Sequence, residues 1–270
     1  MINESINFLY YLPFIFGLCW GSFLKLCIDR LPRNKSIIFP NSECFQCNKP
    51  LLFFDKIPII SWVILKRRCR FCNVIIPSSY PLVELFVGCL IALVFYIFSN
   101  PITIIVYCIF FSLLIIGSGI DLKELWIPDF VSLGGILLGL ILSYFIPSLH
   151  GSDISEIGLL HSFKGLVTGS GILFTIGYFA KLILKQDAMG MGDIKLLVAI
   201  GAFFGWKVVI FCIFFASLIA LIISILLVFL KKKSLRDQIP FGPYLSIASI
   251  LYILLEIQIH NIFTQSLFLY

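Results

Sequence analysis

Charged residues are scarce in this chain of 270 residues, because only 13% are Asp, Glu, Lys or Arg, whereas a soluble domain carries about 25%. This scarcity excludes an ordinary soluble globular domain. Internal repeats, low-complexity tracts and long linkers are also missing. The residues that take the place of charge are apolar, since 60% of the chain is hydrophobic and 28 residues are Phe. The net charge of +6 does not indicate nucleic-acid binding, because the basic residues lie in loops where membrane topology accounts for them.

Several apolar runs of about 18–23 residues are long enough to cross a bilayer. The sequence therefore predicts an all-α integral membrane protein with about eight transmembrane helices. The stretch from Asp193 to Leu230 would reach roughly 57 Å as one helix, nearly twice a ~30 Å hydrocarbon core. We therefore expect a break at Gly205-Trp206-Lys207, with the preceding helix beginning near Met189. The expected spans are 6–28, 82–98, 102–120, 126–147, 163–183, 189–206, 208–230 and 241–260.

The first span lacks a positively charged leading region and a small-residue cleavage site. This pattern indicates a retained helix and not a removed signal peptide.

Lysine and arginine are distributed unevenly between the predicted loops. Nine of the twenty lie between Asp29 and Tyr80, four more lie in KKKSLR (231–236), and the loops at 99–101 and 148–162 contain none. The positive-inside rule then places the 29–80 loop in the cytoplasm and both termini outside. The same loop is expected to lie on anionic lipid, which contributes about 1 kcal/mol per basic residue near the surface. The predicted regions are a first transmembrane helix (1–28), a cytoplasmic loop (29–80) and a polytopic membrane domain (81–270).

The predicted cytoplasmic loop contains two C-x2-C pairs. They are CFQC and CRFC, which supply Cys44, Cys47, Cys69 and Cys72. Two such pairs can close four thiolates around one tetrahedral Zn²⁺ at about 2.3 Å. The loop is too short and too polar to build much of a core, and a structural metal would supply the missing folding free energy. The alternatives are two disulfides, which a reducing cytoplasm disfavours, or four thiols without a role.

Two aspartates lie at the predicted cytoplasmic ends of spans. Asp121 ends the third span, and Asp193 follows Gly190-Met191-Gly192 at the start of the sixth. An ionised Asp costs at least ~2.5–3.5 kcal/mol in hydrocarbon, which suggests a functional role. Two carboxylates at one depth can share a proton, so that one activates water while the other protonates a carbonyl. Gly190 and Gly192 would let an extended peptide approach the backbone.

Structural roles compete with this catalytic interpretation. Asp193 after glycines at a helix start is also an ordinary N-terminal capping arrangement. Asp129 follows Pro128 at another helix start and is expected to be a cap or a supporting residue. Glu84, in YPLVELF, is a cap, a salt-bridge partner or a further site residue.

Six segments, taken in order, resemble the bacterial type IV prepilin peptidases over nearly the whole chain. Several independent motifs in the same order make the resemblance specific, well beyond a lone Gly-x-Gly-Asp. The segments are GSFLKLCIDRLPR (21–33), FDKIPIISWVILKRRCRFC (54–72), YPLVEL (80–85), IDLKELWIPD (120–129), GMGDIKLLVAIGAFFGW (190–206) and PFGPYL (240–245).

The resemblance implies that Asp121 and Asp193 are an aspartic protease pair. It implies a prepilin or pseudopilin substrate of a type IV pilus or type II secretion system, whose short basic leader is cut after Gly at the cytoplasmic face of the bacterial inner membrane. It also implies N-methylation of the new N-terminal residue with S-adenosylmethionine as co-substrate. A peptidase without methyltransferase activity is the alternative.

Two other classes of membrane protein would share some of these features. An ion-coupled transporter would also carry intramembrane carboxylates, but the acids here gather at one face and form no relay across the bilayer. A membrane redox protein could use the C-x2-C pairs, but the thioredoxin-like βαβ context is missing.

Overall fold

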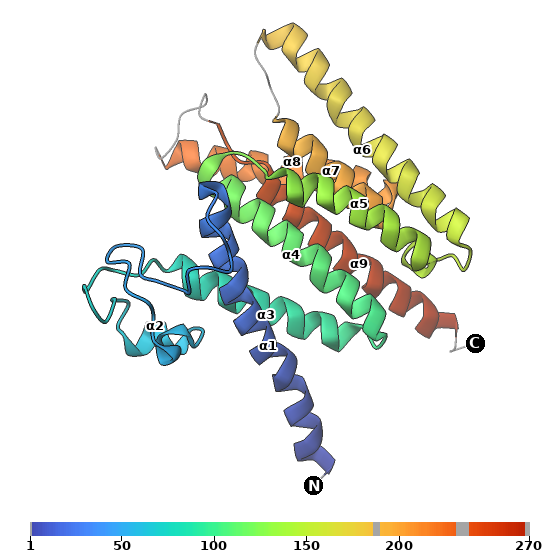
Figure 1. Ribbon diagram of the computed structural model, residues 1–270. Helices are drawn as coiled ribbons and strands as arrows, with labels where there is room; N and C mark the ends of the chain where they lie inside the picture. Colours follow the sequence, from blue (N-terminus) through green and yellow to red (C-terminus); the bar gives the residue numbers. More distant parts are fainter. Residues whose placement is uncertain (1, 186–189, 231–237, 268–270) are drawn as a thin grey trace. The chain divides into compact units, whose positions relative to one another are not determined.

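Helices make up nearly all the regular secondary structure that the structure describes (Figure 1). The computed structural model describes residues 2–185, 190–230 and 238–267, with the backbone alone at 2–10, 184 and 257–267. Within these ranges the only β-pairings are two isolated bridges. The elements are α1 (Ile2–Arg30), η1 (Leu31–Arg33), η2 (Phe53–Lys56), α2 (Ile60–Ile64), α3 (Ser79–Ile97), α4 (Pro101–Glu124), α5 (Asp129–Phe145), η3 (Pro147–His150), α6 (Ser155–Leu184), α7 (Met191–Phe204), α8 (Trp206–Phe229) and α9 (Gly242–Leu267).

Five of the described helices are long and apolar enough to cross a membrane, namely α1, α3, α4, α6 and α8. Asp129–Phe145 and Gly242–Glu256 are shorter apolar helices. The 14 residues of α7 rise only about 21 Å, less than the ~30 Å hydrocarbon core. The structure confirms an all-α, multi-pass membrane protein, and the number of crossings stays a prediction.

The chain forms two compact units, Met1–Ser112 and Leu113–Tyr270. In the first unit α1 packs along α3 (Figure 1) through a Gly-x3-Gly pair. A Cβ added to Gly17 would lie 2.8 Å from the Cα of Gly88, and one added to Gly21 would lie 2.9 Å from the Cα of Glu84. Small residues are common at helix contacts in membranes because they let two backbones approach.

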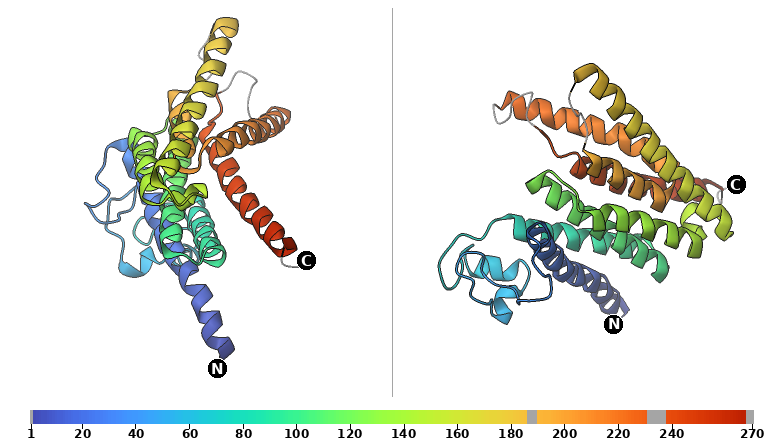
Figure 2. Two further views of the ribbon diagram at one scale, coloured as in Figure 1. Left: turned by 90° about the vertical axis from the view of Figure 1, so that its right-hand side faces the viewer. Right: turned by 45° about the horizontal axis from the view of Figure 1, so that its top comes forward.

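In the second unit α5, α6 and α7 lie side by side (Figure 2). A Cβ on Gly201 of α7 would lie 2.5 Å from the carbonyl oxygen of Gly165 on α6, and one on Gly139 of α5 would lie 2.9 Å from the Cβ of Ala202. Glycines therefore hold the C-terminal half of α7 at backbone distance from both α5 and α6.

The expected break between the sixth and seventh spans is confirmed. Gly205 separates α7 from α8 with φ of +83°, a conformation that glycine adopts without steric cost. The helix expected at 163–183 begins earlier, at Ser155, because hydropathy marks only the apolar part of a helix whose first turns are polar. The predicted start near Met189 and the KKKSLR segment lie outside the described residues.

Candidate functional site

Asp121 lies near the C-terminal end of α4, where a negative charge is normally disfavoured by the helix dipole. Its side chain is nevertheless buried, with 4% exposure. The Oδ2 atom accepts a 2.9 Å hydrogen bond from the backbone N–H of Gly242, the first residue of α9. The carboxylate of Asp121 therefore lies at the positive end of a second helix, which compensates for its burial.

Asp193 lies at the third position of α7, after the N-cap residue Gly190. Its carboxyl group hydrogen-bonds with the backbone of Gly190, and a Cβ on Gly190 would lie 3.2 Å from Asp193 Oδ2. In a capping box the side chain at the third helical position bonds to the backbone of the N-cap residue, and Asp193 makes this contact. The structure thus gives Asp193 the capping contact that its position predicts, and it also leaves the side chain partly exposed.

The two aspartates belong to the same unit and interact. The negative charge of Asp121 acts electrostatically on Asp193. Ile127, in the turn between α4 and α5, lies between the two helix ends that hold them. A Cβ on Gly192 and a Cβ on Gly242 would each lie 3.2 Å from a side-chain carbon of Ile127. Glycines therefore let the first turns of α7 and α9 close around this turn.

Asp129 is the first residue of α5, directly after the N-cap residue Pro128. It forms an ion pair with Lys195 of α7, at 2.6 Å between Asp129 Oδ1 and Lys195 Nζ. Lys195 lies two residues after Asp193, so the ion pair joins the N-terminal end of α5 to the turn that carries Asp193. The carboxylate of Asp129 is 67% exposed, which makes the contact a modest constraint.

Glu84 lies in the first unit, on α3, and is buried with 6% exposure. Its Oε2 accepts a 2.8 Å hydrogen bond from the backbone N–H of Ile59. Ile59 has φ of +59°, which is strained for a β-branched residue. Glu84 therefore holds the segment before α2 against α3, and its described contacts do not include the aspartate pair.

The four predicted cysteines form one cluster in the first unit. The Sγ atoms of Cys44, Cys47, Cys69 and Cys72 all lie within 4.8 Å of one another, and the Cys44 and Cys72 sulfurs are 3.7 Å apart. A tetrahedron with 2.3 Å metal–sulfur bonds requires sulfur–sulfur distances of roughly 3.8 Å. All four are free thiols, so the structure has no disulfide there. The donor set and the spacing suit a tetrahedral metal.

The thiol of Cys69 is poised to ionise. Burial raises its pKa, but hydrogen bonds with the backbone of Cys72 and Phe71 and with the side chains of Cys44 and Cys72 stabilise the thiolate more strongly. The pKa of Cys69 consequently falls to about 7. A thiolate is the form that binds a metal.

The two C-x2-C pairs repeat the same backbone turn. In the first pair the Cys44 N–H donates to the Lys49 carbonyl oxygen, and the Asn48 N–H donates to that of Cys44. In the second pair the Cys69 N–H donates to the Val74 carbonyl oxygen, and the Asn73 N–H donates to that of Cys69. The two isolated bridges, Glu43 with Pro50 and Arg68 with Ile75, close the turns. Asn48 and Asn73 both have positive φ, which Asn tolerates better than most residues. The repeated C-x2-C-N is a short signal that the sequence analysis missed.

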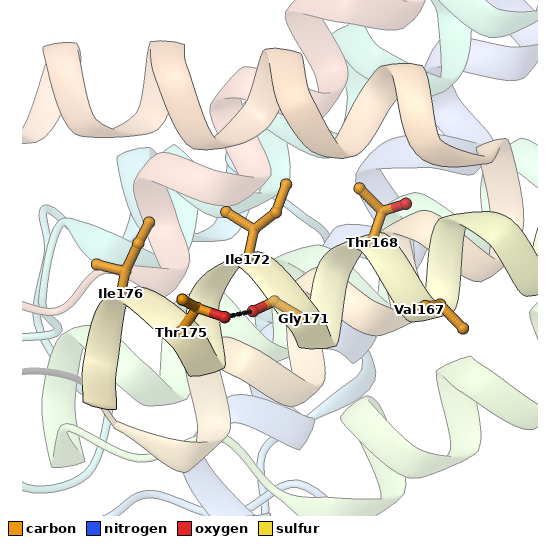
Figure 3. Close-up of a pocket in the computed structure, with 6 residues that line it drawn as sticks. All are labelled: Val167, Thr168, Gly171, Ile172, Thr175 and Ile176. Atoms are coloured by element: carbon orange, nitrogen blue, oxygen red, sulfur yellow. Dashed lines mark hydrogen bonds between the residues drawn. The ribbon is translucent and has the colours of Figure 1, made fainter. Parts of the chain in front are cut away.

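An apolar groove on α6 lies apart from all these residues (Figure 3). Its volume is about 380 Å³. Figure 3 shows its lining residues along one helix, with Thr175 donating a hydrogen bond to the carbonyl oxygen of Gly171. The groove contains no titratable side chain. The residues that line it are Val167, Thr168, Gly171, Ile172, Thr175 and Ile176.

Gly242 and Lys195 are the site residues that sequence reasoning missed. Both lie in quoted motifs, PFGPYL and GMGDIK. Glycine followed by proline at a helix start is a usable signal, since Pro favours the first helical turn. That signal marks the helix start, but it does not reveal the partner 121 residues away.

Two family models match separate parts of the chain. Residues 15–98 match the Bacterial Peptidase A24 N-terminal domain, and residues 108–225 match the Type IV leader peptidase family. The first range contains the four clustered cysteines and Glu84, and the second contains Asp121 and Asp193. No solved structure matches the chain significantly.

Curated relatives match over most of the chain. A prepilin leader peptidase/N-methyltransferase of Aeromonas salmonicida is 31% identical over 277 residues, covering 92% of this chain and 91% of the relative. One from Myxococcus xanthus is 32% identical, covering 79% and 62%. A type 4 prepilin-like proteins leader peptide-processing enzyme of Escherichia coli is 30% identical, covering 89% and 91%. The chain belongs to the prepilin leader peptidase/N-methyltransferase family.

Proposed function

We propose that this protein is an aspartic endopeptidase of the bacterial inner membrane that uses Asp121 and Asp193 as its catalytic pair. It removes the basic leader of type IV prepilins or pseudopilins after Gly, and it then N-methylates the new N-terminal residue. The observation that carries the proposal is the pairing of two carboxylates at the first turns of two helices, α9 and α7, within one unit.

The geometry supports proton sharing by the pair. Each carboxyl group contacts backbone at a helix N-terminus, through Gly242 for Asp121 and through Gly190 for Asp193. Because two nearby like charges repel, the pair titrates as a unit and holds one proton over part of the pH range. The ionised member draws a proton from water as it attacks the peptide carbonyl, and the protonated member gives its proton to the carbonyl oxygen.

The roles of the metal and the co-substrate are part of the same proposal. Cys44, Cys47, Cys69 and Cys72 hold a structural Zn²⁺ that replaces the core which the loop lacks. S-adenosylmethionine supplies an electrophilic methyl group when bound, and the accepting amine must be neutral. We place the basic loop against anionic lipid, with both termini outside and the aspartate pair at the cytoplasmic face.

The test is cleavage of a prepilin with a Gly-Phe junction by full-length protein in lipid nanodiscs, followed by mass spectrometry. Asp121→Asn and Asp193→Asn should each lower cleavage by roughly 10⁴-fold or more, because groups that act as one unit fail together. Asp129→Asn is the matched acid-to-amide control and should have a milder effect. Full cleavage by either variant of the pair would rule out the aspartic mechanism.

Methylation has its own readout in the same experiment. The cleaved product should gain one methyl group when S-adenosylmethionine is present, and the variants of the aspartate pair should still methylate a pre-cleaved substrate. Complete cleavage with an unmethylated N-terminus under saturating donor would make the protein a peptidase alone.

A further inference from the structure

The first unit encloses a polar cavity that the proposed cleavage chemistry does not use. Its volume is about 240 Å³, and it lies between α1, α3 and the loop that carries the four clustered cysteines. Small-molecule pockets usually occupy roughly 300–1,000 Å³, so this cavity is slightly smaller than that range and would enclose part of such a ligand. Cys44 and Cys69 are among its lining residues, so the cysteine cluster also forms part of the cavity wall.

The interior of the cavity is rich in carboxylates. Asp29 accepts a 2.7 Å hydrogen bond from the Tyr80 hydroxyl and forms an ion pair with Lys25. Glu84 hydrogen-bonds with two neutral groups, the N–H of Ile59 and Ser22. A buried carboxylate is stabilised by a positive charge nearby. Lys25 already supplies that charge to Asp29, so the interior favours a ligand that brings a cation to Glu84.

Aromatic rings also line the cavity. Trp62 is fixed by a 3.2 Å hydrogen bond from its indole N–H to the carbonyl oxygen of Ile76, and Tyr80 is fixed by Asp29. Aromatic faces attract cations, and they also stack on planar heterocycles. Each of these rings already has one protein cation near a face, because Lys25 Nζ lies 4.1 Å from the ring centroid of Tyr80 and Arg67 Cζ lies 5.2 Å from that of Trp62.

The outer part of the cavity is basic. Arg33, Lys35 and Lys56 line it and are exposed. Arg30 also lines the cavity, but its guanidinium donates to backbone carbonyls of Ser36, Pro40 and Asn41 and thereby has a structural role. The exposed bases suit a carboxylate on the ligand, and they repel a basic peptide such as a prepilin leader.

We propose that this cavity is the binding site for S-adenosylmethionine, which rests on the methyltransferase part of the proposed function. The molecule combines a sulfonium, a planar heterocycle and an amino-acid carboxylate, and the cavity offers a complement to each. In this assignment Glu84 would face the sulfonium, an aromatic ring of the wall would stack on the adenine, and the bases at the mouth would hold the carboxylate.

The first experiment measures binding and not turnover. Equilibrium dialysis of methyl-labelled S-adenosylmethionine against full-length protein in nanodiscs gives Kd. Ser61→Phe fills the cavity from α2 and should weaken binding at least tenfold. Ser78→Phe makes the same change at an exposed position outside the cavity and should bind as the unchanged protein does. Equal binding by Ser61→Phe and Ser78→Phe would overturn the assignment.

The second experiment tests the recognition of charge. Lys56→Glu should weaken binding roughly tenfold through loss of a charged hydrogen bond, whereas Lys66→Glu, on the same loop but outside the cavity, should change Kd less than twofold. S-adenosylhomocysteine lacks the sulfonium charge and should bind more weakly than S-adenosylmethionine. Glu84→Gln should shrink that preference. If Glu84→Gln only misfolded the loop, binding of both ligands would weaken and the ratio of their Kd values would not change. An unchanged ratio would therefore count against the proposal.

The outcomes separate this inference from the proposed function. If the unchanged protein binds the methyl donor and every cavity variant binds it equally well, the donor binds elsewhere, and the proposed methyltransferase activity is not affected. No binding together with an unmethylated product removes the methyltransferase itself. Displacement of the labelled donor by a synthetic basic leader peptide would assign the cavity to the prepilin leader instead.

Discussion

The two compact units hold their candidate sites by different means. In Met1–Ser112 the cysteine cluster lies on a loop with short helical turns, and its backbone order comes from two repeated knuckles and from Glu84. In Leu113–Tyr270 Asp121 lies near the end of α4 against the first turn of α9, and Asp193 lies in the first turn of α7. Glycines let these helix ends approach one another. The first arrangement depends on side-chain ligands, and the second depends on backbone proximity.

This difference predicts that the two sites fail separately. A loop without much core loses its order when its ligand set is broken, whereas a glycine contact fails when any side chain is added, because the interior is already close-packed. Substitutions can therefore be chosen to disturb one site and spare the other.

The largest expected effect is on the metal. Purified protein should hold about one zinc per chain, and Cys44→Ser combined with Cys47→Ser should lose it, because one knuckle cannot complete four-coordinate zinc. Metal content by mass spectrometry measures this. Cys19→Ser combined with Cys89→Ser removes two exposed thiols of α1 and α3 and should keep the metal. Protein without metal and with four titratable thiols in the native state would refute the zinc assignment.

An effect of roughly 10²-fold is expected at Gly242. A Cβ there would lie 2.9 Å from Asp121 Oδ2, so Gly242→Ala must displace the carboxylate or α9, and small displacements of catalytic groups have costs of this order. The readout is kcat for leader cleavage, with zinc content unchanged. Gly134→Ala is the control, since a Cβ at Gly134 meets nothing within 4 Å. Full activity of Gly242→Ala would show that catalysis does not depend on the contact between Asp121 and the N-terminal end of α9.

A several-fold effect is expected from the ion pair beside Asp193. Lys195→Met and Asp129→Asn should each lower kcat by about two- to fivefold, because exposed pairs contribute ~0.2–1 kcal/mol. The double variant should be no worse than the single variants if the two residues act only through each other. Additive losses would show that Lys195 has a role apart from Asp129.

The smallest expected effect is a pH dependence in the second unit. Burial, and then the charge of His161, lowers the pKa of His150 from 6.5 to about 4. The native state therefore binds fewer protons than the unfolded state between these values, so stability falls as pH falls from about 6.5 towards 4. His150→Gln should show a smaller drop in Tm between pH 7 and pH 5 than the unchanged protein. An identical drop would mean that His150 does not contribute.

The sequence predicted the features that depend on local pattern. The apolar runs gave the positions of the long helices, Gly205 marked the break between α7 and α8, and the spacing of the cysteines predicted their cluster. Asp121 and Asp193 could be proposed because each carboxylate stands at the edge of an apolar run.

The contacts that the sequence did not reveal join distant parts of the chain. The N–H of Gly242 reaches Asp121, and the backbone of Ile59 reaches Glu84. Every residue except proline has a backbone N–H, so the residue types at these positions do not predict either hydrogen bond. Lys195 is different, because a lysine two residues after Asp193 could have been singled out, but its partner depended on how α5 and α7 pack.

The hydrogen bond from Gly242 to Asp121 has a consequence for inhibitor design. One carboxylate oxygen, Oδ2, is engaged by the backbone, which fixes the rotation of the carboxyl plane and directs Oδ1 as the remaining acceptor. On the proposed mechanism, a hydroxyl that mimics the tetrahedral intermediate must approach Asp121 from the Oδ1 side. Stereoisomers of such a compound should therefore differ in affinity, and the preferred hand would report the orientation of the scissile bond.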